Sequence, residues 1–145
     1  MTPEFAVAIF VAVVAAATPI LIAALGELVV ERSGVLNLGV EGMMLIGAVT
    51  AFIVSVTTGV PALGALAAMA AAAASSLIFG YLTLTLAANQ VATGLALTIF
   101  GTGVSALVGA NYVGMTTPAF GSISPAALAQ DPIWRVVFGY SPLVY

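Results

Sequence analysis

Four long apolar runs constrain the fold of this chain more than any other feature. They cover residues 5–25, 36–56, 62–86 and 91–108, and Glu41 is the only charged residue among them. A helix needs roughly 20 mostly apolar residues to cross the hydrocarbon core of a bilayer. The sequence therefore predicts an all-α fold, a polytopic transmembrane helical bundle with about four spans.

The composition excludes several classes of protein. Hydrophobic residues make up 63% of the chain and charged residues 5%, whereas an ordinary soluble domain has about 25% charged residues. Two arginines are the only basic residues, which is too few for a nucleic-acid interface. Because the chain has no Cys and no His, disulfides, thiolate or imidazole metal sites and a Ser-His-Asp triad are also excluded. No nucleotide-binding P-loop pattern occurs, so we expect no catalytic residue, no metal and no cofactor.

Polar residues gather at the start of the second apolar run. Residues 26–34 form a short polar joint, which we expect to be a turn at the membrane surface. Asn37 and Glu41 follow it four residues apart and would share one face if the segment is helical. An ionisable group at membrane depth costs roughly 2.5–3.5 kcal/mol and usually marks a pathway or a polar joint. Three readings stay open: the pair lines a substrate route, the pair pins the helix end to neighbouring backbone, or Glu41 lies in water at the interface.

A second polar joint precedes the fourth apolar run. Asn89 and Gln90 lie in it, and Thr93 follows within the next helical turn. We count these three side chains, with Asn37 and Glu41, as candidates for a pathway or a polar joint. The threonine hydroxyl can also bond to its own helix backbone and then needs no ligand.

Small residues predict where helices approach one another. Gly39 and Gly42 flank Glu41, and Gly101, Ser105 and Gly109 are spaced four residues apart. In a bilayer, small side chains let helix backbones pack closely. We therefore expect these five residues at helix contacts.

The last third of the chain lacks a clear span. Residues 111–141 contain several prolines and glycines and are expected to form an extramembrane loop. Residues 142–145 resemble the start of a fifth helix. We treat the whole chain as the N-terminal part of one transmembrane domain.

Two segments carry a resemblance to a known family. Residues 26–48 and 88–103 look like the signature of ABC-transporter inner-membrane permeases of the branched-chain amino acid, ribose and nucleoside superfamily. Sugar permeases typically have an Asp-Leu-Ser-type element where this chain has Asn37-Leu38-Gly39, and amino-acid permeases tend to have Asn-Phe-Ala. The ending Glu41-Gly42-Met43-Met44 favours the nucleoside, or simple-sugar, branch. The resemblance begins near Thr18 and covers about the front half of a typical family member, so we read the chain as a fragment or a truncated gene product.

The resemblance implies a function and a set of partners. The chain would be part of a permease subunit of an ABC importer for nucleosides or simple sugars, in a bacterial cytoplasmic (inner) membrane. Its partners would be a second permease subunit, cytoplasmic ATP-binding subunits that power transport, and an extracytoplasmic substrate-binding protein. The alternatives are a branched-chain amino acid permease and a membrane scaffold or channel subunit without an ABC partner. An enzyme is disfavoured because no pair of carboxylates and no metal cluster converges in the spans.

Overall fold

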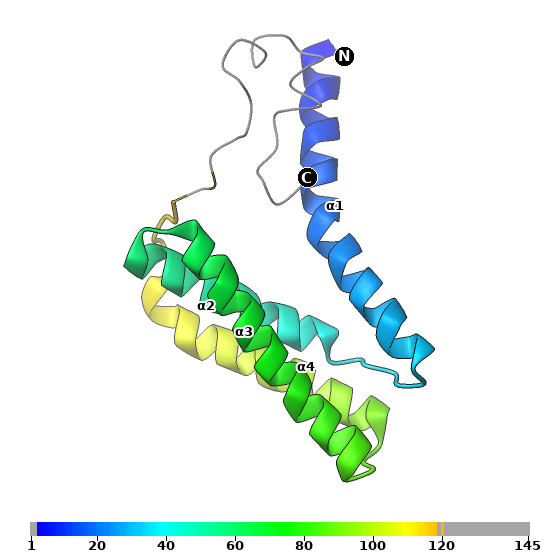
Figure 1. Ribbon diagram of the computed structural model, residues 1–145. Coiled ribbons are helices and arrows are strands. Elements are labelled where there is room, and N and C mark those ends of the chain that lie inside the picture. Colours follow the sequence, from blue (N-terminus) through cyan, green and yellow to red (C-terminus); the bar gives the residue numbers. More distant parts are fainter. Residues whose placement is uncertain (1–2, 119, 121–145) are drawn as a thin grey trace. The chain divides into compact units, whose positions relative to one another are not determined.

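The computed structural model describes residues 3–118 and 120, and every regular element among them is a helix (Figure 1). The four long helices are α1 (Pro3–Arg32), α2 (Val40–Thr58), α3 (Pro61–Gly80) and α4 (Gln90–Gly109). All four are long and apolar enough to cross a membrane. The expected all-α fold with four such helices is confirmed. Where each helix would enter and leave a bilayer stays a prediction.

Two boundaries differ from the sequence analysis. Helix α1 continues to Arg32, so most of the expected joint at residues 26–34 is helical and only Ser33 and Gly34 form the turn. Helix α2 begins at Val40 rather than at residue 36. The prediction that Asn37 and Glu41 share one helical face is therefore wrong, because Asn37 precedes the helix.

Turn chemistry sets the other helix ends. Helix α2 stops at Gly59, which has a left-handed φ of 72° and donates its N–H to the Ser55 carbonyl at 2.9 Å. Pro61 then opens α3, at a position where a missing N–H costs nothing. Asn89 caps α4, since its side-chain oxygen accepts the Ala92 N–H at 3.0 Å.

The end of α3 departs from regular α-helical geometry. It passes into a π-helical turn, η1 (Tyr81–Thr85), and Ala87 then takes a positive φ of 50°. A short 3-10 turn, η2 (Ala110–Tyr112), follows α4. Most of the expected loop at 111–141, and the expected helix start at 142–145, lie outside the described residues.

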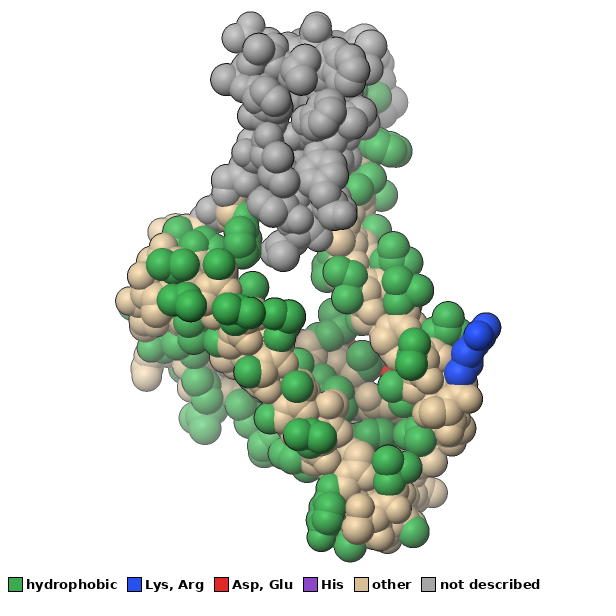
Figure 2. Space-filling model, viewed as in Figure 1, with side chains coloured by type: hydrophobic (Ala, Val, Ile, Leu, Met, Phe, Trp, Pro, Cys, Tyr) green, Lys and Arg blue, Asp and Glu red, His purple; other side chains and the backbone are tan. Residues whose placement is uncertain are grey.

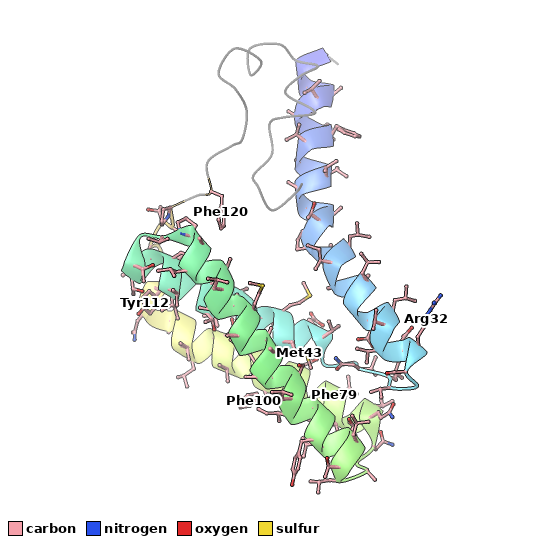
Figure 3. All side chains as sticks on the ribbon, in the orientation of Figure 1. Arg32, Met43, Phe79, Phe100, Tyr112 and Phe120 are labelled. Carbon is pink, nitrogen blue, oxygen red and sulfur yellow. The ribbon has the colours of Figure 1, made fainter. Side chains whose placement is uncertain are left out.

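The chain divides into two compact units, and Glu27–Ala119 is one of them. Within it, α2 packs against both α3 and α4, whereas α3 and α4 contact each other much less. One buried side chain from each of these three helices forms the small core: Met43, Phe79 and Leu97. Figure 3 labels the first two. Most large apolar side chains are exposed, and Figure 2 shows them along the visible faces of these helices. Such surfaces suit lipid or further helices rather than water.

Close backbone approach holds α2 against α3. A Cβ added at Gly64 of α3 would lie 2.7 Å from the Ala51 carbonyl and would collide with the Ser55 hydroxyl. Gly47 of α2 faces Ala68 in the same contact, with a Cβ-to-carbonyl distance of 3.5 Å. The pair therefore packs through small residues, as helices do in lipid.

Candidate functional site

The segment between α1 and α2 is fixed by side chains that lie outside it. The Leu36 N–H donates to Gln90 Oε1 of α4 at 2.8 Å, and the Asn37 N–H donates to Glu27 Oε1 of α1 at 2.9 Å. The next residue, Leu38, bonds through its carbonyl, which accepts the Thr98 hydroxyl at 3.0 Å.

These contacts satisfy three successive backbone groups that no secondary structure pairs. The bond to Asn37 is part-buried and the other two are exposed, and an intramolecular hydrogen bond contributes about 0.5–1.5 kcal/mol net. We call the arrangement the loop clamp, and its three side chains are Glu27, Gln90 and Thr98. The clamp ties the end of α1 and the start of α2 to the first three turns of α4.

Asn37 shapes the loop itself. Its side chain is buried, its Oδ1 accepts the Gly39 N–H at 2.9 Å, and its Nδ2 contacts Met43 Sδ at 3.8 Å. An Asn that bonds the backbone two residues ahead forms an Asx turn. The carboxamide is thus engaged inside the protein, which favours a structural role over direct contact with a ligand.

Glycines allow the clamp to close. A Cβ on Gly94 of α4 would lie 2.8 Å from the Leu38 nitrogen and 2.9 Å from the Gly39 nitrogen. Two turns further along α4, a Cβ on Gly101 would lie 2.5 Å from the Gly42 carbonyl oxygen. Helices α2 and α4 therefore meet backbone to backbone, and any side chain at these points would push them apart.

The remaining candidate packing residues make looser contacts. A Cβ on Gly39 would meet Leu97 Cδ2 at 3.0 Å, and one on Gly109 would meet Val49 Cγ2 at 3.4 Å. Ser105 lies between Gly101 and Gly109 on α4 and is half-buried.

The remaining polar candidates lie in different surroundings. Glu41 is in the first turn of α2 and is exposed. Gln90 belongs to the loop clamp. Asn89 caps α4, and Thr93 lies one turn later. Asn89 and Thr93 both line a cavity of about 530 Å³ bounded by α3, η1 and α4, which we call the α3–α4 cavity.

The sequence analysis missed three parts of this site: Glu27, Gly94 and Thr98. The sequence does contain a pattern that indicates two of them. Gln90, Gly94 and Thr98 are spaced four residues apart and so share one face of α4. That polar-small-polar stripe is the face that receives the loop. No such pattern indicates Glu27, because its partner Asn37 lies beyond the turn that follows α1.

No group of three or more metal-ligating side chains occurs within the described residues. What the arrangement offers is hydrogen bonding and shape: a fixed loop, an exposed carboxylate, and a cavity with a polar end.

Comparison with known proteins gives consistent matches. A family model described as "branched-chain amino acid transport system / permease component" matches residues 9–138. A protein of Haloferax volcanii, provisionally named glucose ABC transporter permease protein TsgC13, is 46% identical over 110 residues, 76% of this chain and 33% of that protein. The guanosine ABC transporter permease protein NupQ of Bacillus subtilis is 38% identical over 98 residues, 63% of this chain and 31% of that protein. The chain thus spans about a third of the length of these relatives. No solved structure gives a significant match.

Proposed function

The chain belongs to the family of permease components of branched-chain amino acid transport systems, and from that premise we propose that it forms part of the translocation pathway of an ABC importer for nucleosides or simple sugars. The observation that carries the proposal is the family match over residues 9–138. Four helices long and apolar enough to cross a membrane agree with that role.

The substrate class rests on the relatives. One is named for glucose and the other for guanosine, and both of these molecules contain a sugar ring. A branched-chain amino acid is the second candidate, because the family description names it. We favour the sugar-containing substrates, because both relatives are named for a compound of this kind.

The proposal includes partners and a place in the cell. A second permease subunit, identical or not, would complete the membrane pathway, and lipid would cover the exposed apolar faces. Separate cytoplasmic ATP-binding subunits would supply the energy, and an extracytoplasmic binding protein would deliver the substrate. The membrane would be the bacterial cytoplasmic (inner) membrane. This chain would then perform no chemical step and would be a transport subunit rather than an enzyme.

The loop clamp supports the proposal physically. An importer must expose its pathway to one side of the membrane at a time, and such changes proceed through rigid segments that move as units. The clamp makes the end of α1, the loop and the start of α4 one such unit. The exposed Glu41 at the start of α2 is the side chain that this arrangement leaves available to a substrate hydroxyl or a partner subunit.

Gene deletion with complementation tests the function. A strain lacking the gene should lose high-affinity uptake of radiolabelled guanosine or glucose, and the intact gene should restore it. A matched test with radiolabelled leucine separates the second candidate. If the strain loses leucine uptake alone, the substrate is a branched-chain amino acid rather than a nucleoside or sugar. Unchanged uptake of all three compounds would overturn the proposal.

A further inference from the structure

The α3–α4 cavity has the size and lining of a small-molecule site. Its volume of about 530 Å³ lies within the range of roughly 300–1,000 Å³ that is usual for ligand pockets. Eight of its ten lining residues have apolar side chains, and Asn89 and Thr93 are the two polar ones. Ligand pockets commonly combine apolar walls with a few polar groups that fix orientation.

The two polar groups retain hydrogen-bonding capacity. On α4, the Thr98 hydroxyl bonds the Leu38 carbonyl and the Thr102 hydroxyl bonds the Thr98 carbonyl. The Thr93 hydroxyl has no such partner among residues 3–118. Asn89 uses its side-chain oxygen in the helix cap, and within the same residues its NH₂ group donates to nothing. A donor from Asn89 and a donor-acceptor from Thr93 are therefore available to a ligand.

Aromatic side chains form part of the apolar wall. Phe79 from α3 and Phe100 from α4 both line the cavity. Phe79 is only 4% exposed because it packs in the core with Met43 and Leu97, whereas Phe100 is 57% exposed and leaves most of its ring open to a ligand. Aromatic rings bind the flat face of another aromatic ring, including that of a nucleobase. Leu82, in the π-helical turn η1, also lines the cavity. Such π-turns are frequent at functional sites.

We propose that the α3–α4 cavity binds the planar base of a nucleoside, with its face against the Phe100 ring and its polar edge toward Asn89 and Thr93. The proposal rests on the proposed function and narrows its substrate from nucleoside or sugar to nucleoside. A hexose has no flat aromatic face to lie against the Phe100 ring, whereas a nucleobase has one. A lipid chain would gain nothing from Asn89 and Thr93.

Protection of an introduced cysteine tests the proposal, because the chain has no cysteine of its own. Ala96→Cys places a thiol on the cavity lining, and Leu95→Cys places one on the same helix outside the lining. Each variant is assembled into the transporter with cysteine-free partners and treated with a small thiol reagent. We expect guanosine to slow labelling of Ala96→Cys at least fivefold, glucose to leave it unchanged, and neither to affect Leu95→Cys.

Three results would overturn the proposal. Guanosine gives no protection, glucose protects equally, or the thiol at position 96 is never labelled because another segment fills the cavity. Two further substitutions add a second test in the Ala96→Cys background. Thr93→Val and Phe100→Ala should each require about tenfold more guanosine for half protection, while Ile99→Ala, which is not on the lining, should not. Equal protection in all three variants also contradicts the proposal.

Uptake by the unsubstituted transporter separates this proposal from the proposed function. If neither guanosine nor glucose is taken up, the proposed function fails. If either is taken up and guanosine gives no protection, only the cavity proposal fails.

Discussion

Replacing Gly101 by Ala should separate α2 from α4 at their closest approach. A Cβ at this position would lie 2.5 Å from the Gly42 carbonyl oxygen and 2.6 Å from the Gly42 Cα. Favourable contacts between non-bonded carbon atoms lie at about 3.5–4.0 Å. The helices must therefore move apart by about 1 Å at this point, because the neighbouring atoms are backbone and cannot rotate away.

The size of the effect follows from two opposing terms. Adding a carbon to a well-packed contact costs about 1–3 kcal/mol, and Ala gains about 0.8–1 kcal/mol over Gly within a helix. Gly101→Ala should therefore lower the free energy of unfolding by up to about 2 kcal/mol. Gly103→Ala is the matched control, since a Cβ there meets nothing within 4 Å and only the propensity gain applies. The difference between the two variants should thus be about 1–3 kcal/mol.

Unfolding in mixed micelles with increasing SDS, followed by far-ultraviolet circular dichroism, measures this difference. Both variants are compared with the parent at the same lipid-to-detergent ratio. If the two alanine variants agree within about 0.5 kcal/mol, the close crossing of α2 and α4 is not a feature of the folded protein and the reasoning fails.

Three further predictions concern the polar residues. Thr98→Val removes the donor to the Leu38 carbonyl and should cost about 1 kcal/mol in the same unfolding assay, whereas Thr102→Val, whose bond is within its own helix, should change stability by less than half as much. Asn37→Ala breaks the Asx turn and should lower stability by about 1 kcal/mol, and a thermal melt with parental midpoint would exclude the structural role. Glu41→Gln should leave stability within about 0.5 kcal/mol of the parent, because this side chain is exposed, and a larger loss would show that the carboxylate is part of the packed structure.

Hydropathy was sufficient to predict the helices but not all of their ends. The runs at 62–86 and 91–108 correspond closely to α3 with η1 and to α4, because a run of roughly 20 apolar residues is typical of a membrane-spanning helix. The predicted start of α2 is four residues too early, because residues 36 and 38 are apolar and extend the apolar run into a non-helical segment. There the Asn37 side chain bonds the backbone of Gly39, and such local bonds compete with the helix.

Less of the site than of the fold could be predicted from the sequence. The sequence indicates Asn37 as a polar residue with apolar neighbours and Gln90 as part of a polar joint, but it does not indicate their partners. Gln90 bonds a residue 54 positions away, and Thr98 bonds one 60 positions away. Local periodicity carries no information about such pairs. The resemblance to a transporter family therefore led to the proposed function, whereas the structure was needed to find the loop clamp.

Transport by the purified components tests the central claim most directly. The transporter that contains this chain is reconstituted in proteoliposomes with its ATP-binding subunits, and uptake of radiolabelled guanosine and glucose is followed with ATP present on the side of those subunits. We expect accumulation of at least one of the two, dependent on ATP hydrolysis and on the substrate-binding protein. Reconstituted, correctly assembled transporter that accumulates neither substrate, or that accumulates one equally well without ATP, would contradict an importer for nucleosides or simple sugars.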